Sequence, residues 1–261
     1  MLMKVLRVFS ILIISSFLFC GKTENEMIEE AIRERVAGKY AQAETILREA
    51  LAKSENEVIY KELGNIYLLG MENLEEAEKY YMKSLQINPS YINSIHNMGL
   101  VYLKRYEQSQ DQTGKGDMQL LEKAHSYLQK SLAINSQFLL SRQEMAKYHF
   151  YKGEFDKAIS EIQIAIAQDS RNARGYSIAG QIYLKGKNDL EKALRNFEDG
   201  YALNRQDTDL LLLLARTTKM LKDEVKADFY LKQYREIMRR KGYSDDDIEK
   251  IANATGSGFG N

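Results

Sequence analysis

Apolar and polar positions alternate through most of the chain with the period of an α-helix. Between residues 60 and 67, apolar or small residues recur at offsets of three, four and seven, which lie on one face of a helix. Residues 77–85 repeat this pattern in a second helix, which Asn88-Pro89 ends because proline lacks a backbone N–H. Such a pair cannot bury its apolar face alone, so the pattern predicts further copies.

One alanine marks the second helix of each predicted pair. It recurs at spacings of 34, 47, 34, 35 and 34 residues, as Ala43, Ala77, Ala124, Ala158, Ala193 and Ala227. Four residues later comes an apolar residue, namely Leu47, Tyr81, Leu128, Ile162, Phe197 and Leu231. The first helices carry a small residue in turn, at Ala31, Gly64, Gly99, Ala146, Gly180 and Ala215. Small residues let two crossing helices approach closely, so the chain is predicted to be all-α and built of helix pairs.

This pattern resembles the tetratricopeptide repeat, a helix–turn–helix unit of 34 residues. The resemblance implies an α-solenoid of about six repeats over residues 24–241. The copies match the family pattern to different extents. The predicted repeats are 24–56, 57–91, 92–138, 139–172, 173–207 and 208–241. Tyr60 and Tyr176 match the aromatic residue that the family places early in the first helix, and Pro89 matches its closing proline. The first and last repeats depart most from the family pattern, as terminal repeats usually do.

The third predicted repeat is 47 − 34 = 13 residues longer than the standard unit, and the excess lies between Tyr102 and Ala124. We expect its first helix to extend, to turn at residues 113–116, and its second helix to begin with Asp117 as N-cap. Two interpretations stay open for the insertion of residues 103–117. It is either a projecting arm for a partner or a surface insertion that the fold tolerates.

Both ends of the chain carry further signals. After the last repeat, Ser244 is expected to N-cap a capping helix over residues 242–255, and residues 256–261 are expected to form a flexible tail. At the other end, Lys4 and Arg7 precede an apolar run of twelve residues, 8–19. A basic start and a short apolar run are typical of a signal peptide, predicted here over residues 1–19.

A single cysteine, Cys20, directly follows that apolar run. Its position resembles the lipobox of bacterial lipoproteins, although Leu18 and Phe19 stand where the family has small residues. The resemblance implies acylation of Cys20 and a polar tether over residues 20–26. It also implies an exported protein anchored to a bacterial cell-envelope membrane, for which we expect the outer membrane. An ordinary signal peptide or an uncleaved anchor is the alternative.

Composition narrows the classes of function. The 37 Lys and Arg residues equal the 37 Asp and Glu residues, and removal of residues 1–19 leaves 35 − 37 = −2. A near-neutral chain lacks the basic footprint of a nucleic-acid binder. Residues 175–179 imitate a nucleophile elbow but fall inside a predicted helix, whereas that motif requires a strand and a sharp turn. His96, His125 and His149 are not at ligand spacing, so the sequence predicts no catalytic residue, no metal site and no cofactor.

The tetratricopeptide resemblance also implies a concave groove lined by the first helices. The predicted peptide-binding residues are Lys61, Asn65, His96, Asn97, Leu100, Gln143, Lys147, Arg174, Gln181 and Arg216. Five of the twenty inward-facing positions are Lys or Arg and one is acidic, which favours an extended peptide with an acidic segment or a free carboxylate. Lys61, Asn65 and Asn97 resemble part of the carboxylate clamp of chaperone-binding domains. Leu140 and Glu144 stand where that clamp would have its remaining basic residues, so the clamp is incomplete. Asparagine is also common at such positions whatever the repeat binds.

These features together predict a non-enzymatic scaffold, held at a membrane through Cys20, that binds proteins or peptides in its groove. A role in the assembly of envelope or outer-membrane complexes would fit this architecture. Two alternatives remain, an adaptor for peptidoglycan-modifying enzymes and an enzyme whose site the sequence does not reveal.

Overall fold

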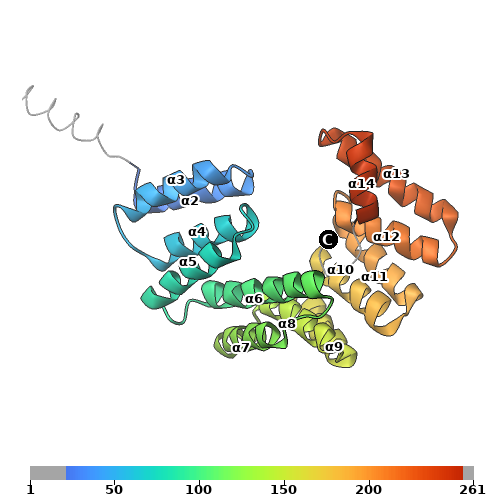
Figure 1. Cartoon of the computed structure of the whole chain (residues 1–261), viewed down its shortest axis with the longest axis horizontal. Coiled ribbons are helices and arrows are strands. Elements are labelled where there is room, and N and C mark those ends of the chain that lie inside the picture. Colours follow the sequence, from blue (N-terminus) through green and yellow to red (C-terminus); the bar gives the residue numbers. More distant parts are fainter. Residues whose placement is uncertain (1–21, 255–261) are drawn as a thin grey trace, which may run out of the picture. The chain divides into compact units, whose positions relative to one another are not determined.

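A computed structural model of the chain describes residues 22–254, and the predicted signal peptide, Cys20 and the predicted tail lie outside this range. Within it the chain is helical with short connections and without a β-strand (Figure 1). The helices are α2 (Glu24–Val36), α3 (Tyr40–Leu51), α4 (Glu57–Leu69), α5 (Leu74–Ile87), α6 (Ile92–Thr113), α7 (Met118–Ile134), α8 (Leu139–Tyr151), α9 (Phe155–Gln168), α10 (Ala173–Gln181), the π-helix η1 (Ile182–Lys187), α11 (Leu190–Leu203), α12 (Thr208–Met220), α13 (Glu224–Arg240) and α14 (Asp245–Ala254). None of the helices in the described range is long and apolar enough to cross a membrane.

The chain divides into two compact units, residues 1–94 and residues 95–261, which we call unit 1 and unit 2. In unit 1, α2 packs on α3 and α4 on α5 as helix pairs, and α3 packs on α4. In unit 2 the pairs α8–α9, α10–α11 and α12–α13 repeat this arrangement, and each second helix packs on the next first helix. The predicted all-α solenoid of helix pairs is thereby confirmed.

The predicted small positions lie where the two helices of a pair approach most closely. A Cβ atom on Gly64 would lie 2.5 Å from Cε1 of Tyr81, and one on Gly180 would lie 2.4 Å from Cε1 of Phe197. Both rings are fully buried, so glycine makes room for them. Where the small residue is alanine, the facing residue is aliphatic, as in the pairs Ala31–Leu47, Ala146–Ile162 and Ala215–Leu231. In these five repeats glycine faces an aromatic ring and alanine faces an aliphatic side chain, whereas Gly99 in repeat three faces Leu128.

Four of the second helices end in the same type of turn. The C-cap residues of α5, α7, α9 and α11 accept a hydrogen bond from the N–H two residues later, in the pairs Asn88–Ser90 (3.2 Å), Asn135–Gln137 (2.9 Å), Asp169–Arg171 (3.0 Å) and Asn204–Gln206 (3.2 Å). Asparagine and aspartate favour such turns because their short side chains reach the nearby backbone. The polar C-cap residue of these four repeats therefore fixes the direction in which the chain enters the next repeat.

The insertion in repeat three forms the predicted long helix, turn and new helix. Asp117 accepts a hydrogen bond from the N–H of Gln119 at 2.8 Å, which confirms it as the N-cap of α7. Tyr106, on the extension of α6, is buried and lies 5.0 Å from the ring of Tyr151 on α8. Residues 111–115 and 117–119 are exposed. The base of the insertion therefore belongs to the core of unit 2, and its tip faces solvent.

A π-helical turn interrupts the first helix of repeat five. The turn, η1, falls in the repeat whose alanine spacing is 35 residues, one more than the standard unit. A π-turn holds one more residue than an α-turn, so it absorbs the extra residue without moving the ends of the repeat. A Cβ atom on Gly186 in this turn would lie 2.5 Å from the ring of Phe155, which shows how closely the widened turn packs on α9.

The last helix, α14, packs on α13. Gly242 has a φ of 91°, which reverses the chain after α13, and the Ser244 hydroxyl accepts a hydrogen bond from the N–H of Asp247 at 3.2 Å. Ile248 is buried in the core formed by α12 and α13. This helix therefore covers apolar surface at the end of unit 2.

Candidate functional site

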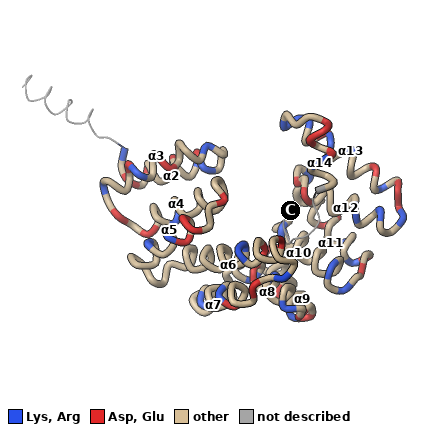
Figure 2. The backbone as a smooth tube through the Cα atoms, in the orientation of Figure 1, with Lys and Arg blue, Asp and Glu red and all other residues tan. Residues whose placement is uncertain are grey.

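The ten side chains predicted to line a groove lie on the first helices of repeats two to six. Lys61 and Asn65 are on α4 in unit 1, and the other eight are on α6, α8, α10 and α12 in unit 2. Lys and Arg are interspersed with Asp and Glu along the chain in both units, as Figure 2 shows. The environment of each predicted residue therefore depends on its local partners.

Three of the predicted residues are buried. His96 is 4% exposed, Gln143 0% and Gln181 5%. The His96 Nδ1 lies 3.0 Å from the Ser141 Oγ, which connects α6 to α8. The Gln143 Nε2 donates to the Asn172 Oδ1 at 3.1 Å, which connects α8 to the N-cap of α10. His96 and Gln143 therefore join neighbouring helices, and all three side chains are too deeply buried to present a surface to a partner.

Glu144 on α8 is the centre of a charged cluster in unit 2. Its carboxylate is completely buried, Arg174 donates to its Oε1, and the Lys147 Nζ lies 3.4 Å from its Oε2. Burial raises the pKa of Glu144, but Lys147 and Arg174 outweigh this effect and lower the pKa to about 2. The cluster therefore places two cations, Lys147 and Arg174, around one buried carboxylate.

His96 lies beside this cluster and is held neutral. Burial is the main cause that lowers its pKa to about 4. The carboxylate of Glu144 acts in the opposite direction, whereas Arg174 and Lys147 lower the pKa further. At neutral pH the imidazole therefore serves as an uncharged hydrogen-bond partner of Ser141, whose hydroxyl also lies 2.7 Å from the Ser131 hydroxyl.

Unit 1 contains a related cluster around Glu62 on α4. Glu62 is 2% exposed and accepts hydrogen bonds from Lys61, from the Arg35 Nε at 2.9 Å and from the Asn65 Nδ2 at 3.1 Å. Burial raises the pKa of Glu62, but Lys61 and Arg35 outweigh it, and the pKa lies below its ordinary value. The Tyr81 hydroxyl donates to the Asn65 Oδ1 at 2.9 Å, so Asn65 connects this cluster to the core.

The structure adds Glu62 and Glu144 to the predicted set and gives Arg216 a structural contact. Glu62 was not among the residues predicted from the sequence, and Glu144 stood there only as a departure from the clamp pattern. Both lie two residues before the small position of their helix, with a lysine one or three residues away. Arg216, a predicted groove residue, donates through its Nη2 to the Ala252 carbonyl at 2.8 Å, so it helps to hold the C-terminal turn of α14.

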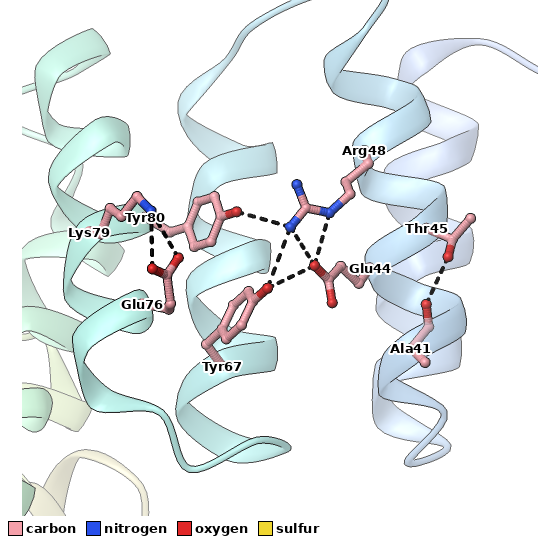
Figure 3. Close-up of polar contacts among 8 residues, drawn as sticks. All are labelled: Ala41, Glu44, Thr45, Arg48, Tyr67, Glu76, Lys79 and Tyr80. Carbon is pink, nitrogen blue, oxygen red and sulfur yellow. Dashed lines mark hydrogen bonds and ion pairs between the residues drawn. The ribbon is translucent and has the colours of Figure 1, made fainter.

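Another polar cluster lies on the surface where α3, α4 and α5 meet (Figure 3). Arg48 donates to the Glu44 Oε1 and to the hydroxyls of Tyr67 (3.4 Å) and Tyr80 (3.2 Å). The Tyr67 hydroxyl also donates to Glu44 at 2.8 Å, and the rings of Tyr67 and Tyr80 are stacked 5.3 Å apart. The Arg48 side chain is 52% exposed, so solvent screens this cluster far more than the two buried ones.

Residues 22–254 contain no group of three or more His, Cys, Asp or Glu side chains that could hold a metal ion. The His125 ring stacks on the Tyr148 ring, and the His149 ring lies edge-on to it, with centroid distances of 4.2 Å and 5.1 Å. His149 is paired with Glu154 at 2.7 Å. The geometry of these histidines is thus one of ring packing and hydrogen bonding.

Comparisons with known proteins agree with this architecture. Two models of the tetratricopeptide repeat match residues 59–91 and 144–209. A curated relative, the photosystem I assembly protein Ycf3 of Synechococcus sp. (strain CC9311), is 36% identical over 83 residues, or 31% of this chain. The match spans 48% of that relative, about half its length.

Several solved structures share the fold. The thermophilic tetratricopeptide repeat protein TTC0263 of Thermus thermophilus has a TM-score of 0.66 at 20% identity, covering 75% of this chain and 98% of that one. The type IV pilus biogenesis factor PilW has a TM-score of 0.65 at 16% identity, covering 89% and 99%. At such identities the likeness concerns the fold alone. Together with the two model matches over residues 59–91 and 144–209 and the repeated helix pairs, this likeness identifies the chain as a tetratricopeptide repeat protein.

Proposed function

We propose that this chain is a non-enzymatic scaffold that binds an acidic, extended segment of a partner protein beside Arg174 in unit 2. Tetratricopeptide repeat domains generally bind protein partners, and members of the family are generally scaffolds without catalytic activity.

Arg174 carries the proposal. Its side chain is 43% exposed, while the carboxylate that it contacts is fully buried. A guanidinium group has five N–H donors, and the Glu144 carboxylate accepts only from one edge of it. Glu144 therefore orients the arginine and leaves its other N–H groups exposed, an arrangement suited to a carboxylate of a partner.

The assembly of a multi-protein complex is the process that we favour for this scaffold. The curated relative that matches 83 residues of this chain is named as an assembly protein, which supports this choice. Anchoring through an acylated Cys20 at a bacterial envelope membrane is part of the same proposal, and it is supported by the basic start, apolar run and single cysteine of residues 1–20.

Peptide binding tests the proposed surface. A fluorescent peptide of alternating acidic and small residues should bind the full chain, and a peptide with lysine in place of the acids should bind weakly or not at all. Arg174→Gln should lower the affinity for the acidic peptide by about tenfold, since one charge-assisted contact is lost. Arg195→Gln, at an exposed position on α11, is the matched control and should bind like the unchanged chain. Equal loss in both variants, or equal binding of both peptides, would count against the proposed surface.

Membrane fractionation tests the anchor separately. Cys20→Ser should move the protein from the membrane fraction to the soluble fraction, because an acyl chain stabilises membrane binding by about 0.8 kcal/mol per buried CH₂. Full retention of the Cys20→Ser variant in the membrane would overturn the lipid anchor and leave the binding surface untouched.

A further inference from the structure

The outer face of α13 exposes two large apolar side chains in its first two turns. Val225 is 82% exposed and Phe229 is 52% exposed. They are four residues apart and therefore lie on the same stripe of the helix. The rings of Phe229 and Tyr230 pack edge to face, with 5.3 Å between their centroids. The apolar stripe is thus held in place by the core and faces solvent.

The other repeats of the chain show that this stripe is unusual. The two positions lie two residues before and two residues after the alanine of the second helix, and both are exposed in all six repeats. The equivalent pairs are Ala41 and Thr45, Glu75 and Lys79, Glu122 and Ser126, Asp156 and Ser160, and Glu191 and Arg195. Repeats two to five are polar at both positions, so the helix pair itself does not require an apolar residue at either one.

The chain's own capping helix does not cover the stripe. The ion pairs between α13 and α14 are formed by Arg235 with Glu249 (2.8 Å) and by Arg239 with Asp245 (2.7 Å), in the last turns of α13. Val225 and Phe229 lie in the first turns and keep the exposure given above with α14 in place. A further surface is needed to remove them from water.

Charges beside the stripe indicate what that surface is. Asp228 and Lys232 flank Phe229, both are exposed, and they have opposite charges. A two-fold interface brings the same patch of two copies together in opposite directions. With the two-fold axis beside residue 230, Phe229 packs against Phe229 of the second copy, and each Asp228 faces the other copy's Lys232. The patch is therefore complementary to itself in charge.

We propose that the outer face of α13 is a self-association surface, through which two copies of this chain pair with their α13 helices antiparallel. One helix face is smaller than the roughly 800 Å² that each partner contributes to a standard interface, so the pairing is weak and depends on concentration. It leaves the surface beside Arg174, which is on α10, available to a partner. A scaffold that pairs in this way would present two copies of its binding surface.

Analytical ultracentrifugation of the full chain, in a density-matched detergent, tests the proposal. The average mass should rise from monomer towards dimer as the protein concentration rises. Phe229→Ser should raise the dissociation constant by about tenfold or more, because a central aromatic contact is removed. The double change Glu191→Ser with Arg195→Ser, at the equivalent positions of repeat five, should leave the dissociation constant unchanged. Circular dichroism should show that every variant keeps its helical content.

Charge reversal gives an independent test that leaves the apolar residues intact. Asp228→Lys and Lys232→Asp should each weaken pairing, and an equimolar mixture of the two variants should pair more tightly than either one alone. The proposal is overturned if the average mass stays that of a monomer at every concentration. It is equally overturned by self-association that Phe229→Ser leaves unchanged, or by a mixture that pairs no better than its components.

Discussion

The buried glutamates of the two units occupy the same place in their repeats and have different surroundings. Glu62 in unit 1 accepts hydrogen bonds from three side chains, those of Lys61, Arg35 and Asn65. Glu144 in unit 2 accepts one, from Arg174, and its Oε2 has no hydrogen-bond donor among the described residues although Lys147 lies 3.4 Å away. The carboxylate that is more deeply buried therefore has the fewer hydrogen bonds.

This difference shows what such a cluster contributes. A buried ion pair is weak evidence for added stability, because the cost of removing the charges from water offsets their attraction. Its loss is expensive, because one charge then remains buried without a partner. Glu62 can lose one donor and keep two, whereas Glu144 depends on Arg174. Unit 2 should therefore be the more sensitive of the two to a single substitution.

The largest effect is expected from Arg174→Ala. The variant leaves the Glu144 carboxylate buried beside Lys147 alone, at a cost of about 3 kcal/mol. Arg35→Ala should cost about 1 kcal/mol, since Lys61 and Asn65 still donate to Glu62. Native-state hydrogen exchange measures both locally, because damage in a repeat array stays near its source. Protection in α8 and α10 should fall about a hundredfold in the first variant, and protection in α2 and α4 about tenfold in the second. A larger loss in Arg35→Ala would contradict the comparison.

Acid should destabilise unit 2 more than unit 1, because His96 lies in unit 2. The unfolded histidine binds a proton near pH 6.5 and the folded one only near pH 4, so stability is complete above pH 6.5 and is lost as the pH falls to 4. The loss in unit 2 should reach about 2–3 kcal/mol. His125, whose pKa burial also lowers, adds to it with the same sign.

Unit 1 contains no histidine, so it should keep its stability over this range. The pKa of Glu62 lies below its ordinary value, and the corresponding loss therefore begins only as the pH falls below about 4.5. Hydrogen exchange at pH 6.5 and pH 4.5 measures the two responses, and His96→Gln should remove most of the change in unit 2. An equal fall in both units would show that His96 is not its cause.

A smaller effect is expected at the close helix crossings. Gly180→Ala should cost about 1–2 kcal/mol, because the added methyl group meets the buried Phe197 ring. The double change Gly180→Ala with Phe197→Leu should cost less than the sum of its parts, since alanine faces an aliphatic residue in three other repeats. Thermal unfolding of the two single variants and the double variant gives the coupling. Strict additivity would disprove it.

The smallest effect is expected from Arg48→Ala. Arg48 contacts three side chains, those of Glu44, Tyr67 and Tyr80, but its own side chain is 52% exposed. Exposed ion pairs contribute about 0–1 kcal/mol, so burial and not the number of contacts should decide the cost. Urea unfolding of Arg48→Ala and Arg174→Ala under the same conditions tests this order. A cost for Arg48→Ala equal to that for Arg174→Ala would refute it.

The sequence was sufficient to predict the helix pairs, the turn of the insertion and the N-cap role of Asp117. Periodicity records which face of a helix is buried, and these features depend on residues close together in the chain. The sequence was insufficient to predict that His96, Gln143 and Gln181 are buried. A position that faces the groove side of its helix can still be covered by the neighbouring repeat. The arginine partners of the buried glutamates are 27 and 30 residues away, so no local pattern marks these two ion pairs. Only the alanine spacing of 35 residues hinted at the π-turn.

The direction of the two ion pairs along the chain has a consequence for synthesis. When Glu62 leaves the ribosome, its partner Arg35 has already been made, so repeat two can close onto a completed neighbour. Glu144 emerges 30 residues before Arg174, and until then its carboxylate has only Lys147 to compensate it. Domains generally fold from the N-terminus during synthesis. Repeat four must therefore wait, partly open to water, for the first helix of repeat five.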